Sequence, residues 1–451
     1  MKNIGIFHYK VGGTDGVSLE IEKWQRVFEE MGHTVFLCGG DLGTAEGTLI
    51  EEMFHHLPEA LRLNSNTFVA LQDFDAAGYT TELEGLTAVL EQKFRTFIQE
   101  KQIDFLIAEN VWSVAAHPAV APALARVMAD LQLPTIAHSH DFYWERVDGV
   151  ALTCAAAINL ADKYLPPRHP LVKHALINSL GQKELRERKG LESVVVPNVF
   201  DFDAPPWTAD SYNQDFRERI GLRENDLFIL QATRIVPRKG IELAIDFVAA
   251  LNHPARRAKL EKLGLYNGRS FTSDSRIVFV LAGYAQDDAS GQYVGKLQQK
   301  IAQTGIDALF IEELIESDRL MRDGQKVYSL WDSYVYADFV TYPSLWEGWG
   351  NQLLEAIRAR LPFMLFEYPV YEVDIKDKGL HAVTLGDTVT GYDEQGLAQI
   401  SPEMMETAAD EAIALLTNKQ QYQQTVEHNF QVGQTYYSMN ALRHHLEGLM
   451  E

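Results

Sequence analysis

The chain has 451 residues, of which 46% are hydrophobic and 23% are charged, and its formal net charge at pH 7 is −23. This length predicts two or three domains with substantial cores, and the composition is typical of a soluble globular enzyme. The acidic balance argues against a nucleic-acid partner, because nucleic-acid binding depends on Lys and Arg side chains that neutralise phosphates.

The cysteine content and the start of the chain indicate a cellular compartment. Cys38 and Cys154 are the only cysteines, and both stand in apolar contexts, which fits structural thiols in a reducing environment. The chain opens on a predicted β-strand rather than on a long apolar segment, and no stretch reaches the length of a membrane span. We therefore expect a cytoplasmic protein.

The first half of the chain alternates predicted strands and helices. Residues 3–8 read as a buried strand, and a glycine-rich turn leads from it into a helix over residues 18–31. Further strands are predicted over residues 33–37, 103–108 and 133–139, with a helix over residues 81–101. This order is typical of a doubly wound α/β domain, which places its ligands at the carboxyl ends of the strands.

The glycine-rich turn after the first strand has three open roles. Its spacing, Gly12, Gly13 and Gly16, differs from the dinucleotide fingerprint Gly-x-Gly-x-x-Gly, so an NAD site is poorly supported. The turn could lie beneath phosphates, could let an acceptor approach the backbone, or could be a plain tight turn.

A polar and aromatic cluster follows the strand over residues 133–139. It runs from His138 to Arg146, and its mixture of hydrogen-bonding groups and flat aromatic faces is typical of a sugar pocket. His138 and His140 alternate onto one face of a strand, which would suit a metal, although no third and fourth ligand appears at a usual spacing. General acid–base chemistry and a solvated loop remain the other interpretations of these histidines.

The Pro-rich and polar stretch over residues 203–213 reads as a linker to a second domain. That domain opens with a strand over residues 227–232 and a helix over residues 241–251. Arg234 and Lys239 lie in the turn between them, where two cations and a helix N-terminus can converge on a diphosphate. Further strands are predicted over residues 276–282, 309–314, 339–342 and 363–367, with helices over residues 352–360 and from about residue 402 to the end.

The loop before the helix over residues 352–360 carries two glycines and is framed by two carboxylates. Gly348 and Gly350 allow a tight bend and expose backbone N–H groups at the start of a helix, which favours an anion. Glu347 and Glu355 can each accept two hydroxyl hydrogen bonds, and this suits the vicinal diols of a sugar and a ribose.

Residues 347–356, Glu-Gly-Trp-Gly-Asn-Gln-Leu-Leu-Glu-Ala, resemble the nucleotide-sugar signature of GT-B glycosyltransferases of family GT4. The Arg-x4-Lys-Gly pattern at residues 234–240 resembles the phosphate-binding element of that family. The resemblance implies an α/β fold of two Rossmann-like, doubly wound domains that face a cleft. An acceptor domain would span residues 1–200, a donor domain residues 201–427, and a C-terminal helix over about residues 428–451 would cross back to the first domain.

The resemblance also implies roles for individual residues. The catalytic residues would be His140, Arg234, Lys239 and Glu347. The donor would be bound by Gly13, Arg234, Lys239, Glu347, Gly348, Trp349, Gly350, Asn351 and Glu355. The acceptor would be bound by Gly12, Trp112, Asp141, Tyr143, Trp144 and Arg146. Trp349 stands where Phe is usual in the family, which leaves the shape of the sugar pocket open.

The function implied is retaining transfer of a glucosyl or mannosyl group from a UDP- or GDP-linked sugar to a hydroxyl acceptor, with no metal and no cofactor. The loops at residues 140–146 and 343–351 resemble a GT4 branch that includes mannosylglucosylglycerate synthases, for which a small soluble acceptor would fit. A sugar-nucleotide epimerase, a phosphorylase and a non-catalytic nucleotide-sugar-binding subunit stay as alternatives. The sequence leaves the oligomeric state open.

Overall fold

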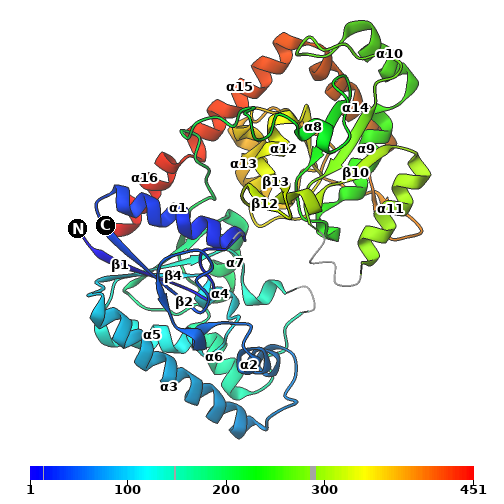
Figure 1. Ribbon diagram of the computed structural model, residues 1–451. Helices are drawn as coiled ribbons and strands as arrows, with labels where there is room; N and C mark the ends of the chain where they lie inside the picture. Colours follow the sequence, from blue (N-terminus) through cyan, green and yellow to red (C-terminus); the bar gives the residue numbers. More distant parts are fainter. Residues whose placement is uncertain (14, 147–148, 285–290) are drawn as a thin grey trace. The chain divides into compact units, whose positions relative to one another are not determined.

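The computed structural model describes residues 1–13, 15–146, 149–284 and 291–451 (Figure 1). The chain divides into two compact units. Unit 1 comprises Met1–Val199 together with Met439–Glu451, and unit 2 comprises Phe200–Ser438. Each unit is built around its own parallel sheet flanked by helices, which confirms the predicted α/β class.

Unit 1 contains a seven-stranded sheet in the order β3-β2-β1-β4-β5-β6-β7, and all neighbouring strands run parallel. The strands are β1 (Asn3–His8), β2 (Thr34–Gly39), β3 (Thr48–Leu49), β4 (Phe105–Glu109), β5 (Thr135–Ser139), β6 (Val172–Leu176) and β7 (Ser193–Val195). Runs of apolar residues form these strands because both faces of a parallel sheet are covered by helices.

Side chains that alternate along the strands build two cores on opposite faces of this sheet. Ile4 and Ile6 of β1 pack with α1 (Gly16–Glu30) and α16 (Met439–Met450), which lie side by side in Figure 1. Phe7 belongs to the other core. That core also holds side chains of α2 (Pro58–Phe68), α3 (Ala76–Glu100), α4 (Val111–Val114), α5 (Val120–Leu131) and α6 (Ala155–Tyr164). Helix α7 (Ser179–Lys189) connects β6 to β7.

Unit 2 contains a six-stranded parallel sheet in the order β10-β9-β8-β14-β15-β16. The strands are β8 (Leu227–Gln231), β9 (Ile277–Leu281), β10 (Asp307–Phe310), β14 (Phe339–Tyr342), β15 (Phe363–Leu365) and β16 (Val383–Thr384), with a separate hairpin of β17 (Gly391–Tyr392) and β18 (Ala398–Gln399). The prediction of a strand over residues 309–314 is wrong in its second half, because Glu312–Leu314 forms a short 3-10 turn.

The helices of unit 2 are α8 (Phe216–Arg219), α9 (Ile241–Leu251), α10 (Pro254–Leu263), α11 (Gln292–Thr304), α12 (Leu330–Tyr336), α13 (Asn351–Arg358), α14 (Pro402–Thr417) and α15 (Lys419–Tyr436). One large core joins α9, α10, α11 and α14 to one face of the sheet. Nearly every side chain of α9 is buried in or around this core.

Both sheets reverse their strand order at one point. In unit 1 the reversal falls between β1 and β4, and in unit 2 it falls between β8 and β14. Doubly wound sheets bind ligands at such a switch point, outside the carboxyl ends of the strands. The loops after β1, β4, β8 and β14 are therefore the positions where the fold itself favours a site.

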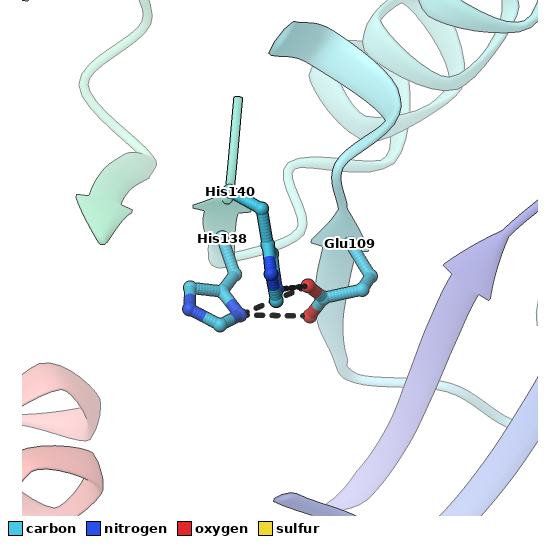
Figure 2. A group of neighbouring side chains, drawn as sticks. All are labelled: Glu109, His138 and His140. Atoms are coloured by element: carbon cyan, nitrogen blue, oxygen red, sulfur yellow. Dashed lines mark hydrogen bonds and ion pairs between the residues drawn. The ribbon is translucent and has the colours of Figure 1, made fainter. Parts of the chain in front are cut away.

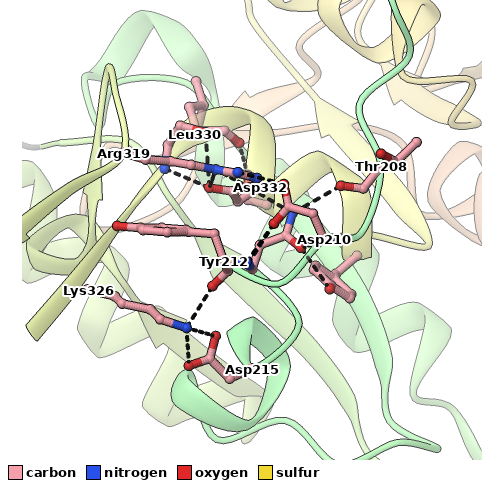
Figure 3. A network of polar contacts seen from close by, with 12 residues as sticks. Thr208, Asp210, Tyr212, Asp215, Arg319, Lys326, Leu330 and Asp332 are labelled. Carbon is pink, nitrogen blue, oxygen red and sulfur yellow. Dashed lines mark hydrogen bonds and ion pairs between the residues drawn. The ribbon is translucent and has the colours of Figure 1, made fainter.

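The segment predicted as a linker is fixed to unit 2 by polar contacts (Figure 3). Its Asn213 is fully buried and donates to the Thr208 carbonyl and to Asp332. Lys326 donates to the Tyr212 carbonyl at 2.8 Å, which ties the segment to a small sheet of β11 (Ile315–Glu316), β12 (Leu320–Arg322) and β13 (Gln325–Ser329). The end of this segment therefore belongs structurally to unit 2.

The C-terminal segment that joins unit 1 is shorter than the expected residues 428–451. Helix α15 stays in unit 2, the helix breaks at Tyr437 and Ser438, and only Met439–Glu451 returns to unit 1. The Phe200 N–H donates to the Tyr437 carbonyl at 2.8 Å, so the two chain passages between the units lie next to each other. Among the described residues, no helix has the length and apolarity needed to cross a membrane.

Candidate active site

In unit 2, two loops meet at the switch point through their backbones. The loop after β8 ends in a short 3-10 turn, Pro237–Lys239, and Gly240 then begins α9 with a φ of +57°. The Leu345 N–H of the loop after β14 donates to the Arg238 carbonyl at 2.9 Å. A Cβ atom on residue 240 would lie 2.4 Å from the Pro343 carbonyl oxygen, so this close approach requires glycine.

The contact between these loops brings Lys239 and Glu347 together. Their side chains form a buried ion pair, with exposed fractions of only 8% for Lys239 and 6% for Glu347. Arg238 completes the cluster, because its Nη1 lies 2.7 Å from Oε2 of Glu347. The cluster of Arg238, Lys239 and Glu347 therefore places two cations around one carboxylate at the position where the fold favours a ligand.

Burial and charge act against each other in this cluster. Burial lowers the pKa of Lys239, and the neighbouring Arg238 lowers it further, whereas Glu347 opposes both effects. Burial alone would raise the pKa of Glu347, but Lys239 and Arg238 hold it below its usual value. Glu347 is thus an ionised carboxylate, and the two cations have a negative partner within the protein.

The turn that leads into α13 is built around Gly350. This glycine has a φ of +129°, and a Cβ atom there would lie 2.4 Å from the hydroxyl of Tyr368. The same hydroxyl donates to the Trp349 carbonyl at 2.7 Å and so fixes the turn. The Trp349 side chain is buried and packs edge-on against Tyr437.

The other predicted donor residues of unit 2 lie on these two loops or on α13. Glu355 stands on α13 and accepts a hydrogen bond of 2.7 Å from the Tyr334 hydroxyl. Gly348 and Asn351 flank the turn and are half-buried, and Arg234 is exposed after β8. The structure therefore brings Lys239 and Glu347 into direct contact and places Arg234, Gly348 and Glu355 on the elements that flank them.

In unit 1, the ends of β4 and β5 form a second cluster, shown in Figure 2. Pairing of these strands sets Glu109 opposite His138. His138 Nδ1 lies 2.9 Å and His140 Nε2 lies 2.8 Å from Oε1 of Glu109. A carboxylate only accepts hydrogen bonds, so both imidazoles direct an N–H group towards it. We call these three residues the Glu109 cluster.

Charge keeps Glu109 ionised although it is buried. Burial would raise its pKa, but His138 and His140 lower it to about 2. Burial would lower the pKa of His140, but the Glu109 carboxylate raises it above its usual value. His8 behaves differently, because its burial dominates and lowers its pKa although it contacts the Glu109 carbonyl at 2.7 Å. His140 is therefore the imidazole that Glu109 favours in its protonated form.

The Glu109 cluster is the one group among the described residues whose donor atoms could hold a metal ion. Two imidazoles and one carboxylate match the donors of several divalent-metal sites. In the structure the same atoms form hydrogen bonds with one another, which is the alternative to binding a metal ion. Sequence reasoning found no third ligand because Glu109 lies on another strand, 29 positions before His138.

In the glycine-rich turn after β1, the backbone conformation and a close neighbour require glycine at position 12. Its φ is +64°, and a Cβ atom there would lie 2.4 Å from the Leu42 carbonyl oxygen. Gly13 is half-buried, and Thr14 of the same turn lies outside the described residues. Asp15 caps α1 by accepting from the N–H groups of Val17 and Ser18. The protein's own carboxylate therefore uses part of the helix N-terminus that a phosphate would need.

Two aromatic residues predicted to bind the acceptor lie in the core. The Trp112 side chain is 1% exposed, and its Nε1 donates to the Ala121 carbonyl at 3.0 Å. Tyr143 is buried against Phe68. We therefore assign packing roles to both residues, because apolar contacts already cover their rings. Asp141 and Trp144 remain half-exposed, and Trp144 stacks on Phe142.

Arg146 is held in a fixed position. Its Nη1 donates to Asn64 at 3.0 Å, its Nη2 donates to the Val114 carbonyl at 3.2 Å, and its guanidinium lies 4.2 Å from the centre of the Phe68 ring. Asn64 in turn donates to the carbonyl of Ala115 at 2.9 Å.

Sequence reasoning missed the roles of Arg238, Glu109 and Asn64. Arg238 is next to Lys239 in the sequence, and this adjacency could have predicted that Arg238 lies at the site. Glu109 directly follows the strand predicted over residues 103–108, which indicated the carboxyl edge of the sheet but no partner for its side chain. Asn64 carries no sequence signal, since its contact with Arg146 spans 82 positions.

The fold, the cluster of Arg238, Lys239 and Glu347 and the Glu109 cluster define the class of protein. Comparisons with known proteins agree with this class. The family model of glycosyl transferases group 1 matches residues 213–429. Two solved structures share the fold. The crystal structure of Anabaena HepE in complex with UDP and glucose has a TM-score of 0.58 at 14% identity, and covers 100% of this chain and 99% of that one. WaaG, a glycosyltransferase involved in lipopolysaccharide biosynthesis, has a TM-score of 0.56 at 13% identity, with 99% of each chain covered.

Two full-length relatives narrow this class. The mannosylglucosylglycerate synthase of Petrotoga mobilis is 35% identical over 440 residues, covering 98% of this chain and 99% of the relative. The mannosylglucosylglycerate synthase of Thermotoga maritima is 36% identical over 443 residues, covering 97% of each. The chain belongs to the group 1 glycosyl transferases and is a glycosyltransferase with the GT-B fold. This result confirms the predicted resemblance to family GT4.

Proposed function

We propose that the protein is a retaining hexosyltransferase that transfers a mannosyl group from a nucleoside diphosphate sugar to glucosylglycerate. The supporting observation is the buried cluster of Arg238, Lys239 and Glu347 at the switch point of unit 2. The acceptor follows from the two full-length relatives, since each is named as a mannosylglucosylglycerate synthase. Mannose is the donor sugar that would complete this product, and glucose is the alternative.

The diphosphate would bind the cations of unit 2. Arg234 and Lys239 would contact its oxygens, together with backbone N–H groups near Gly348 and Gly350, and would stabilise the charge that develops as it departs. Lys239 already pairs with a carboxylate, so the bound diphosphate would replace one negative partner by another. Glu347 would then be released to accept hydrogen bonds from the donor-sugar hydroxyls. Glu355 would hold the ribose.

The transfer breaks the bond between the anomeric carbon and the diphosphate oxygen, and the electron pair leaves with the diphosphate. The acceptor hydroxyl oxygen forms the new bond on the same face of the sugar, and its proton passes to the departing diphosphate. This route needs no covalent intermediate between the sugar and the protein. His140 would contact the donor sugar, with Glu109 holding its imidazole.

The proposed reaction needs no resident metal, since Arg234, Lys239 and backbone N–H groups supply the positive charge. The test is to incubate the purified protein with GDP-mannose, UDP-mannose, GDP-glucose or UDP-glucose and with glucosylglycerate, and to identify the product and its anomeric configuration by NMR. A product with the donor's anomeric configuration, formed equally with and without EDTA, is expected. An inverted product would contradict the retaining mechanism, and loss of activity in EDTA would contradict metal independence.

A further inference from the structure

We propose that Arg146, oriented by Asn64, binds the carboxylate of the acceptor. This inference rests on the proposed function, which gives the acceptor a glycerate group, and it specifies which part of unit 1 recognises that group. Glycerate is a carboxylate at neutral pH. In a chain with a formal net charge of −23, an anionic acceptor needs a local cation.

Arg146 lies at the edge of the unit 1 sheet where the fold favours a ligand. It follows β5, and its backbone-carbonyl partner Val114 ends α4, directly after β4. Tyr9, which follows β1, donates its hydroxyl to the Val111 carbonyl at 3.1 Å and so packs against the same segment. The guanidinium is thus anchored to the loops after the central strands, next to the switch point between β1 and β4.

Other arginines of unit 1 have carboxylate partners, and Arg146 differs from them in this respect. Arg62, Arg126 and Arg188 also lie over aromatic rings. Each of these three bonds a carboxylate, at 2.6 Å, 2.8 Å and 2.9 Å respectively. Arg146 bonds a neutral amide and a carbonyl, and within the described part of the chain it has no carboxylate partner.

The geometry of Arg146 suits a carboxylate in particular. A guanidinium has five N–H donors in a planar fork, and only two of them are used by described partners. The remaining donors can form the paired hydrogen bonds that carboxylates accept from arginine. Half-burial of the side chain strengthens such bonds, because it removes competing water.

Asn64 makes this arrangement rigid. Its Oδ1 accepts from Arg146, and its Nδ2 donates to the carbonyls of Ala115 and Ala116 at 2.9 Å and 3.0 Å. The guanidinium is therefore fixed before the acceptor arrives, which lowers the entropy cost of binding. Asn64 acts as a positioning residue, since its own contacts are with the protein.

The test compares two acceptors that differ in one group, which is charged in one and neutral in the other. Glucosylglycerol carries a hydroxymethyl group where glucosylglycerate carries the carboxylate. We expect wild-type protein to prefer glucosylglycerate. We expect Arg146→Gln to raise the KM for glucosylglycerate about 10- to 100-fold while the KM for glucosylglycerol stays unchanged. Arg146→Lys should keep part of the preference that Arg146→Gln loses, because lysine keeps the positive charge but lacks the planar N–H donors of the guanidinium. Asn64→Asp should weaken the preference, because it supplies Arg146 with an internal carboxylate.

Arg62→Gln is the matched control, since it removes an arginine of the same unit that also lies over a phenylalanine ring, at 4.8 Å. It should leave the preference intact. Equal losses for both acceptors in Arg146→Gln would show a purely structural role and overturn the proposal. A wild-type protein that uses both acceptors equally would overturn it as well.

A binding experiment distinguishes failure of the proposed function from failure of the carboxylate site. If wild-type protein transfers to neither acceptor, the carboxylate site is judged by calorimetric binding of D-glycerate. Binding that Arg146→Gln abolishes supports the site, and binding that the substitution leaves unchanged, or no binding to wild-type protein, overturns it. Thermal shifts with UDP and GDP in both proteins report donor binding independently.

Discussion

The imidazole Nε2 of His140 lies 2.8 Å from the buried carboxylate of Glu109. The pair joins residues 31 positions apart, from the loop after β5 and from the end of β4. Glu109 also accepts from His138, whose ring stacks on Trp24 at 4.2 Å. The orientation and the charge of His140 are therefore set by a residue that no sequence motif marked.

Replacing Glu109 by Gln tests this relationship. The substitution removes the charge that raises the pKa of His140, so the titration midpoint of His140 should move to lower pH. We expect kcat to fall by about 100-fold, because a neutral amide no longer orients the imidazole with the same strength. The measurements are an NMR titration of His140 and kcat as a function of pH. Glu100→Gln, at an exposed position, is the control. An unchanged His140 titration would contradict the pairing.

Lys239→Ala should lower kcat by about 100- to 1000-fold, because Lys239 is proposed to stabilise the departing diphosphate. The substitution also leaves the buried Glu347 with Arg238 as its remaining ion-pair partner, so a thermal melt is needed to show that the variant is folded. Lys262→Ala removes an exposed lysine of α10 and should behave as wild type. Wild-type turnover in Lys239→Ala would refute the role of Lys239.

Gly283→Ala should destabilise unit 2. A Cβ atom at residue 283 would lie 1.8 Å from the Thr233 carbonyl oxygen, which is a backbone atom with little freedom to shift. We expect a loss of more than about 2 kcal/mol in the free energy of unfolding, measured by urea denaturation. Gly85→Ala on the exposed face of α3 meets no atom within 4 Å. It should instead stabilise the protein by about 0.5–1 kcal/mol, because Ala favours a helix.

The stability of unit 1 should fall as the pH is lowered from about 6.5 to about 4. His117 and His174 are buried, and burial lowers the pKa of each to about 4. The unfolded chain binds protons at these histidines near pH 6.5, so it takes up more protons than the folded chain in this window. Each histidine should cost up to about 3 kcal/mol at the acid end of the window.

Urea denaturation at pH 7.5, 6 and 5 measures this effect. His174→Asn should flatten the dependence on pH relative to wild type, because it removes one of the histidines whose pKa is lowered by burial. A stability that rises as the pH falls through this window would contradict the buried neutral state of these histidines.

Local sequence was sufficient for the elements that carry the proposed donor site. Phe339–Tyr342 and Leu227–Gln231 are short apolar runs, and their strand character follows from periodicity alone. Glu347 and Lys239 could be named because each stands in a local motif. Their direct contact across 108 positions required the strand order, in which β14 lies beside β8.

Tertiary structure decided which of the predicted polar and aromatic residues are buried and which stay partly exposed. Trp112 and Arg146 both looked suited to an acceptor in the sequence, yet Trp112 is buried in the core and Arg146 is half-exposed. Glu109 became part of a cluster only through the pairing of β4 with β5. The physical reason is that secondary structure depends on neighbours within a few residues, whereas burial and side-chain contacts depend on segments that the fold brings together from far apart.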